Sequence, residues 1–169
     1  LYCYYVAGTV GYYLTEMFCK YEVLNKKKLL EKCNDFGLLL QKVNIIRDLV
    51  RDYTQKRFFW PRQYLNGISY DQLLKHKNMQ ILNKMVKNAK SHFNDSLRYI
   101  LLIPPEAKDI RLMVSIPLFM AKATLKKCQS GGIYIKNVKL TRVETLMICS
   151  NLKKNISSNT FLKKYFFSI

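Results

Sequence analysis

Hydrophobic residues recur at helical spacing along most of the chain, in segments that turn-forming residues separate. Within residues 1–20 the apolar side chains fall three or four positions apart, as Val6 and Val10 do. Gly8 and Gly11 in the same segment carry no side chain, so another backbone can approach them closely. The pattern therefore predicts a buried helix at this end of the sequence.

A second periodic run extends over residues 29–53, and its middle is apolar on most of its circumference. A helix of this kind belongs in the centre of a bundle, because every side must be covered. Residues 56–69 then break the periodicity with Trp60-Pro61 and Asn66-Gly67, which are typical of turns. We expect a long connection there.

Two Ser/Thr-x-x-Glu/Gln sequences, at residues 69–72 and 141–144, have the form of capping boxes. The first predicts the start of a third helix, whose apolar positions repeat as far as Ile100. The second predicts the start of a fifth helix, which continues to about Leu152.

A fourth helix is expected between these two, from Pro105 in its first turn to Lys127, before Gly131-Gly132 stop it. Residues 133–140 alternate briefly as in a strand, but one short extended piece cannot form a sheet. The predicted fold class is therefore all-α.

Polar residues form a line along the second helix. At 100° per residue, Gln41, Asn44, Asp48 and Asp52 fall within about 80° of one another, and Gly37 lies on the same arc. Buried amides need hydrogen bonds, and carboxylates one turn apart repel unless a cation or ligand lies between them. Magnesium suits such a pair, and the glycine would leave space for a ligand.

A plainer interpretation is a solvated edge, on which Arg47 and Arg51 neutralise the two aspartates. The preceding stretch, residues 36–46, carries Lys42 as its only charge, which indicates that the helix is largely buried. This observation favours the functional interpretation of the polar line.

The length and composition indicate one folded domain with a strong positive charge. The chain has 169 residues, of which 49% are hydrophobic, and 29 Lys and Arg against 11 Asp and Glu give a net charge of +18. Such a charge favours an anionic ligand, and a non-catalytic basic helical module that binds nucleic acid or anionic lipid is one alternative. The basic residues are spread over the whole chain, however, so we expect no nucleic-acid partner.

The cysteine pattern and the hydropathy of the chain indicate where in the cell the protein resides. The five cysteines include no Cys-x-x-Cys pair, which is typical of reduced thiols in an intracellular protein. The uncharged run over residues 1–15 is shorter than the ~20 residues of a membrane-spanning helix. We expect a cytoplasmic or membrane-associated protein with no transmembrane segment in this chain.

Several segments together resemble the C-terminal half of the squalene/phytoene synthase family. They occur in family order, span about residues 1–150, and comprise Tyr-Cys-Tyr-Tyr-Val-Ala-Gly at 2–8, Gly37 to Asp48, Arg-Phe-Phe-Trp-Pro at 57–61, Ile116 to Leu125 and Val-Lys-Leu-Thr-Arg at 138–142. The resemblance implies an isoprenoid synthase-type helical bundle around a central cavity. Residues 1–169 would be the C-terminal part of one such domain, with its N-terminal half missing.

The resemblance also implies a reaction. Family members of the squalene branch condense two farnesyl diphosphates head to head to presqualene diphosphate, and then reduce it with NADPH to squalene for sterol or hopanoid biosynthesis. Because the product is apolar, a peripheral association of the protein with a membrane is compatible with this reaction. Phytoene and dehydrosqualene synthases, which work without NADPH, are the alternative, but Phe-Trp-Pro at 59–61 resembles the squalene branch more closely.

Individual roles follow from the matched positions. Asp48 and Asp52 match the second aspartate-rich motif, which holds Mg²⁺ against diphosphate. Tyr5 matches a catalytic tyrosine that assists the first half-reaction. Substrate-binding positions are matched by Gln41, Asn44 and Arg57, and NADPH-binding positions by Asn44, Lys139 and Arg142.

Three departures from the family pattern accompany these matches. The first aspartate-rich motif is expected upstream of Tyr2, so we expect the isolated chain to be inactive. Arg51 stands where the second motif carries a glutamate. Residues 111–113 are Arg-Leu-Met where squalene synthases carry phenylalanine.

Overall fold

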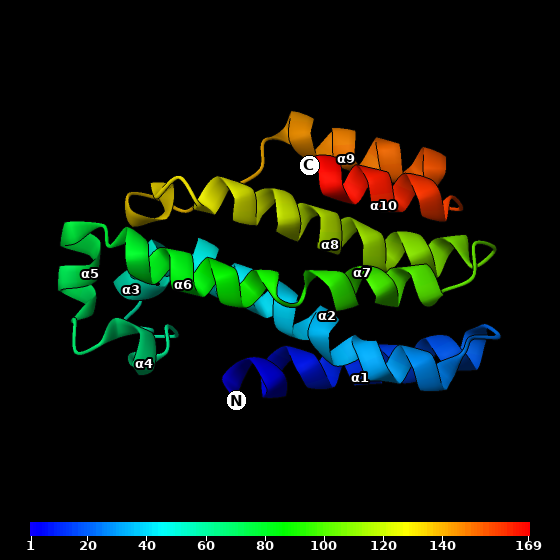
Figure 1. Cartoon of the computed structure of the whole chain (residues 1–169), viewed down its shortest axis with the longest axis horizontal. Coiled ribbons are helices and arrows are strands. Elements are labelled where there is room, and N and C mark those ends of the chain that lie inside the picture. The colour runs from blue at the N-terminus through cyan, green and yellow to red at the C-terminus, as the bar shows by residue number, and fades with distance from the viewer.

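The computed structural model describes all of residues 1–169 and contains helices joined by turns, with no strand (Figure 1). The all-α prediction is therefore confirmed. The elements are a π-helical turn η1 (Tyr4–Gly8), α1 (Thr9–Tyr21), α2 (Lys26–Arg47), α3 (Leu49–Thr54), α4 (Arg62–Leu65), α5 (Tyr70–His76), α6 (Met79–Lys90), α7 (Phe93–Leu102), α8 (Lys108–Cys128), a 3₁₀ turn η2 (Gly132–Tyr134), α9 (Arg142–Asn155) and α10 (Asn159–Ser168).

Helix α2 lies in the centre, as its nearly continuous apolar surface predicts. It packs against η1 and α1 on one side and against α6, α7 and α8 on the other. Figure 1 shows α1 along the lower edge of the molecule and the α9–α10 pair above α8. Leu29, Leu39 and Ile46 of α2 are completely buried. The polar line therefore starts on a helix that packs against η1, α1, α6, α7 and α8.

The predicted second helix is interrupted once, at Asp48. Helix α2 begins three residues before the expected start because the Asn25 side chain accepts a hydrogen bond from the Lys28 N–H (3.2 Å). Asp48 separates α2 from α3, yet the Asp52 N–H still donates to the Asp48 carbonyl (2.8 Å). The two aspartates thus remain one turn apart, as the sequence predicts.

Glycines of α1 and α2 allow two backbones to meet. A Cβ atom on Gly11 would meet the Cys33 carbonyl oxygen, and one on Gly37 would meet the Ala7 carbonyl oxygen. The expected close approach at Gly11 is confirmed. The expectation that Gly37 leaves space for a ligand is wrong, because the backbone of Ala7 fills that space.

Only one face of α1 is buried, so the prediction of a buried helix is wrong for its other face. Thr15 and Phe18 are buried against the rest of the fold, and the Thr15 hydroxyl is hydrogen-bonded to the Tyr99 hydroxyl (2.8 Å). Tyr13 and Val10 are exposed. Sequence periodicity could not distinguish a fully buried helix from a helix with one exposed face, because the exposed residues of this segment are also apolar.

The predicted third helix is divided into α5, α6 and α7. The capping box at Ser69 and Gln72 opens α5 as predicted, but Lys77 adopts a left-handed conformation (φ 46°) that ends it. Asn78 then caps α6 by accepting from the Ile81 N–H (3.1 Å). Because these breaks preserve the apolar spacing, the periodic pattern alone did not reveal them.

Helices α8 and α9 follow the predictions except at the start of α8. Helix α8 starts at Lys108, three residues after the expected Pro105, and it ends before Gly131, which has φ 80°. The capping box of α9 is present: Thr141 Oγ1 accepts from the Glu144 N–H (3.2 Å), and the Thr141 N–H donates to Glu144 Oε2 (2.7 Å). Residues 133–140 form no strand.

Helix α10 was not predicted. Ser158 caps it by accepting from the Phe161 N–H (3.1 Å), and Leu162 and Phe166 are buried one turn apart. This cap and spacing were the available signal. None of the twelve elements has both the length and the apolar character needed to cross a lipid bilayer.

Candidate functional site

A polar pocket of about 250 Å³ lies at the junction of α2 and α3. It brings together five residues that the sequence proposes for binding substrate or metal: Gln41, Asn44, Asp48, Asp52 and Arg57. The remaining lining residues are Tyr2, Ile45, Arg47, Arg51 and Phe59. Four of the proposed residues come from the polar line that runs from α2 through Asp48 into α3, whereas Arg57 reaches the pocket from the connection that follows α3.

Asp48 lies at the base of the pocket and is bound by two guanidinium groups. Arg47 donates from Nε to Oδ1 (2.8 Å) and from Nη2 to Oδ2 (2.7 Å), which is a bidentate pair. Arg51 Nη2 donates to Oδ2 as well (2.5 Å). The hydrogen bond to Asp48 raises the pKa of Arg47, so this guanidinium group stays charged at neutral pH.

Asp52 is bound from the opposite side of the pocket. Arg57 Nη2 donates to Asp52 Oδ1 (2.8 Å), and Arg51 Nε lies 3.9 Å from the same oxygen. The Arg57 guanidinium also faces the Phe59 ring, 5.9 Å from its centre, and Phe59 stacks on Tyr2 with 4.9 Å between ring centres. These aromatic contacts hold the pocket wall and keep Arg57 directed toward Asp52.

The acidic groups lie below the basic ones. The side chains of Asp48 and Asp52 are 6% and 11% exposed, against 32% for Arg47 and 47% for both Arg51 and Arg57. The opening of the pocket therefore presents guanidinium N–H groups. The interpretation that arginines neutralise the aspartates is confirmed, but the two carboxylates are buried and do not form a solvated edge.

This donor arrangement does not fit a divalent cation within the 169 residues. Both oxygens of Asp48 already accept hydrogen bonds, and the chain contains no cluster of three acidic, histidine or cysteine side chains that could hold a metal ion. Magnesium takes oxygen ligands in near-octahedral geometry and is repelled by neighbouring guanidinium groups. Within this chain the two aspartates therefore position guanidinium groups.

The proposed catalytic tyrosine lies outside the pocket. Tyr5 is on η1 with 63% of its surface exposed, and its ring makes an edge contact with Tyr4 (5.4 Å between centres). Tyr2, one turn earlier, lines the pocket in its place. Tyr2 and Phe59 were missed as site residues, although both lie in segments that carry the family resemblance.

The residues proposed for NADPH are not brought together. Asn44 lines the pocket described above, whereas Lys139 lines a second pocket of about 470 Å³ with Lys127 and Lys136. The two pockets are linked, because Asn137 of the second accepts a hydrogen bond from the Arg51 backbone N–H (3.3 Å). Arg142 lines neither pocket and is exposed at the start of α9.

Arg111 lies in the segment, residues 111–113, where the resemblance implies phenylalanine, and its contacts are structural. Its guanidinium group is completely buried and donates to the carbonyl oxygens of Ile156 (2.9 Å) and Ile103, and to Asn159 Oδ1 (2.6 Å). Burial without a carboxylate partner lowers the pKa of Arg111. The side chain ties α8 to the end of α7 and to the α9–α10 turn.

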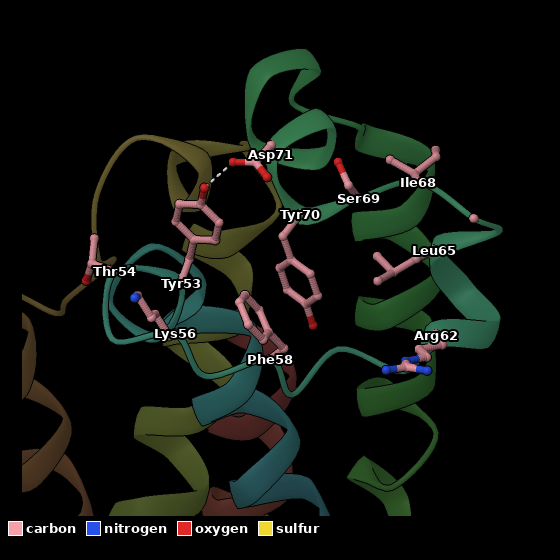
Figure 2. A pocket seen from close by; sticks show the side chains of 11 residues that line it. Tyr53, Thr54, Lys56, Phe58, Arg62, Leu65, Ile68, Ser69, Tyr70 and Asp71 are labelled. Atoms are coloured by element: carbon pink, nitrogen blue, oxygen red, sulfur yellow. Dashed lines mark hydrogen bonds between the residues drawn. The ribbon is translucent and has the colours of Figure 1, made fainter.

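The largest pocket, about 800 Å³, lies beyond α3 and contains none of the proposed site residues. Figure 2 shows the Tyr53 hydroxyl donating to the Asp71 carboxylate, with the Phe58 and Tyr70 rings below them. Its only cationic lining residues are Lys56 and Arg62, whereas three arginines line the smaller pocket. The larger pocket therefore offers fewer donors to an anionic substrate. The chemistry favours the smaller pocket.

A half-buried polar array between α2 and the start of α7 was also missed. Lys42 Nζ and His92 Nε2 are 2.5 Å apart, and His92 Nδ1 is hydrogen-bonded to Asp35. Burial lowers the pKa of Lys42. The signal in the sequence was the seven-residue spacing of Asp35 and Lys42, which places them on one face of the helix.

Comparisons of sequence and structure show which known proteins this chain is similar to. A sequence model described as squalene/phytoene synthase matches residues 1–144. A probable squalene synthase of Neurospora crassa is 35% identical over 167 residues, covering 92% of this chain and 34% of that protein. Squalene synthase 1 of Arabidopsis thaliana is 35% identical over 165 residues, covering 90% and 39%.

A solved structure extends the likeness to three dimensions. The complex of TcSQS with the ligand E5700 superposes with a TM-score of 0.84 at 31% identity, covering 97% of this chain and 51% of that one. The chain thus spans about half of the solved relative, and it covers a smaller share of the two curated relatives.

Proposed function

Since the chain belongs to the squalene/phytoene synthase family, we propose that it forms the C-terminal part of one squalene synthase-type prenyltransferase domain. Its substrate is farnesyl diphosphate, and the completed domain condenses two molecules to presqualene diphosphate. The observation that carries this proposal is the polar pocket, where buried aspartates orient guanidinium groups toward the opening.

The pocket residues suit the first chemical step, in which a prenyl diphosphate loses its diphosphate. Negative charge grows on the departing oxygens, and fixed N–H donors stabilise that charge. Arg57 would donate to these oxygens while Asp52 keeps its guanidinium group in place. Gln41 and Asn44 would add amide donors from the same wall.

The squalene branch is favoured over the phytoene or dehydrosqualene branch. The relatives compared above carry the name squalene synthase. In addition, the Phe-Trp-Pro sequence has a structural role here, because the buried Trp60 donates from Nε1 to the Ile45 carbonyl (3.1 Å). This bond fixes the connection against α2 and so places the adjacent Phe59 in the pocket wall.

The proposed enzyme also uses NADPH as its reductant and Tyr5 as a catalytic residue. The lysines around Lys139 suit the phosphates of a dinucleotide, and NADPH would supply the hydride for reduction to squalene. Asn44, in the adjacent polar pocket, and Arg142, at the exposed start of α9, are the other two residues proposed for NADPH. Tyr5 would transfer a proton or stabilise a cation in the first half-reaction.

We also propose a peripheral membrane association, which an apolar product would require. Val143, Leu146 and Met147 are exposed on α9, and Arg142 and the lysines at 153 and 154 flank this apolar face. An exposed apolar stripe beside cations suits the surface of an anionic lipid bilayer.

Product analysis tests the enzymatic proposal. The chain is fused behind the upstream part of the Arabidopsis relative and incubated with farnesyl diphosphate, with and without NADPH. We expect presqualene diphosphate without NADPH and squalene with it, whereas residues 1–169 alone give neither. Arg57→Gln should abolish product, and the exposed Arg98→Gln is the matched control. A C30 product with a central double bond, formed without NADPH, would establish the alternative branch.

A further inference from the structure

We propose that the polar pocket binds diphosphate directly through its guanidinium groups, without a divalent cation, and that Arg51 is the residue that determines this preference. The inference rests on the proposed function, since it concerns how the same pocket holds its substrate. It departs from the magnesium-holding role that the resemblance implies for Asp48 and Asp52.

The charges of the pocket change from negative at its base to positive at its opening. Asp48 and Asp52 are nearly buried, and each is covered by a guanidinium group that is about half exposed. A cation that enters meets Arg51 and Arg57 before it can reach a carboxylate. A diphosphate meets N–H donors instead.

The charged side chains of the pocket carry a net positive charge. Arg47, Arg51 and Arg57 face Asp48 and Asp52, so three positive charges are set against two negative ones. A Mg²⁺ ion would be repelled by this excess, whereas a polyanion would be attracted to it. The preference is strengthened by partial burial, which reduces screening by solvent.

The hydrogen bonds to the aspartates leave several guanidinium N–H donors free. A guanidinium group has five N–H bonds, and Arg47 uses Nε and Nη2 on Asp48 while Arg51 and Arg57 use Nη2. Their Nη1 groups are not engaged by either aspartate. Paired N–H groups of arginine match phosphate oxygens in a bidentate manner.

Arg51 decides the preference because it contacts both acidic residues. Its Nη2 lies 2.5 Å from Asp48 Oδ2 and its Nε lies 3.9 Å from Asp52 Oδ1. A glutamate at this position would reverse the sign of the net charge. It would also bring a third carboxylate to two that already lie one turn apart, and carboxylate oxygens are ligands of Mg²⁺.

Titration calorimetry on the 169-residue chain tests the inference, with inorganic pyrophosphate as the probe in excess EDTA and in excess MgCl₂. We expect binding in EDTA that magnesium does not strengthen. Arg51→Gln should weaken it about tenfold, the equivalent of one charge-assisted hydrogen bond. Arg51→Glu should lose binding in EDTA and recover it with Mg²⁺, and Arg98→Gln should bind as the parent does.

The outcomes separate the inference from the proposed function. Binding by the parent chain only with Mg²⁺ would overturn the inference and leave the prenyltransferase proposal standing. Absence of binding in both conditions, with the helical circular dichroism intact, would remove the pocket as a diphosphate site and so overturn both. Equal affinity for orthophosphate would overturn the diphosphate preference. Arg51→Lys keeps the charge and should retain metal-free binding.

Discussion

The Asp48 carboxylate lies beneath the Arg51 guanidinium group, with 2.5 Å between Oδ2 and Nη2. Asp48 is buried and Arg51 is half exposed, so the acid orients the base. An acidic pair that the sequence marks as a metal site therefore has arginines between it and solvent, and the pocket that results is suited to anions.

Asp48→Asn should lower turnover strongly in the chain extended by its upstream half. The amide carries no charge to hold Arg47 and Arg51, so the donors lose their fixed orientation. Loss of one preorganised group of this kind costs about 3 kcal/mol in the transition state. Lys84→Gln on the exposed side of α6 should change stability by less than ~0.5 kcal/mol and leave the rate unchanged. Equal rates for the two variants would make the polar line structural.

Gly37→Ala should destabilise the fold, because the added Cβ would meet the Ala7 carbonyl oxygen and push η1 away from α2. Overpacking of this kind costs about 1–3 kcal/mol. Chemical denaturation followed by circular dichroism measures the effect. Gly132→Ala is the matched control, since its nearest neighbours would lie 3.8 Å from the new Cβ and its stability should be unaltered.

Arg111→Ala should be more damaging than an ordinary arginine substitution. The change leaves the Ile103 and Ile156 carbonyl oxygens without their donor in the core, and each unsatisfied group costs about 1–3 kcal/mol. We expect a large drop in the unfolding midpoint. Arg98→Ala, at an exposed position of α7, should leave the midpoint nearly unchanged. Comparable midpoints for the two variants would contradict this structural role for Arg111.

The start of α9 should lose stability in acid. Hydrogen bonds from Lys127 Nζ and from Thr141 lower the pKa of Glu144 from 4.5 to about 2. Because the folded-state pKa is the lower one, this contribution is present above pH 4.5 and is lost as the pH falls toward 2. Hydrogen-exchange protection of the α9 amides, taken relative to their intrinsic exchange rates at each pH, should therefore fall in this window. Glu144→Gln should remove this pH dependence, and a loss of protection that persists in that variant would assign it to another group.

Leu146→Glu should weaken sedimentation with phosphatidylserine vesicles by about tenfold, which corresponds to the apolar burial of one leucine. The side chain lies in the exposed apolar face of α9, where a negative charge also opposes the flanking cations. Val23→Glu, at an exposed apolar position between α1 and α2, is the control and should sediment as the parent does. Identical behaviour of the two variants would exclude α9 as the membrane-facing surface.

The sequence by itself determined most of the helices and the positions where several of them begin. Capping boxes and apolar spacing depend only on residues within one or two turns, so Ser69 and Thr141 mark helix starts without knowledge of the fold. Helical geometry likewise places Asp48 and Asp52 one turn apart. For the same reason the polar line was visible from the spacing of residues along α2.

The tertiary structure alone decided what surrounds that line. Arg57 reaches Asp52 from the irregular connection after α3, and no periodicity specifies where such a residue lies. Whether the space beside Gly37 is empty or filled depends on Ala7, thirty positions away, and the exposure of Tyr5 depends on which face of η1 packs against α2. These contacts join residues that are distant in the chain, so their geometry follows from packing and not from local pattern.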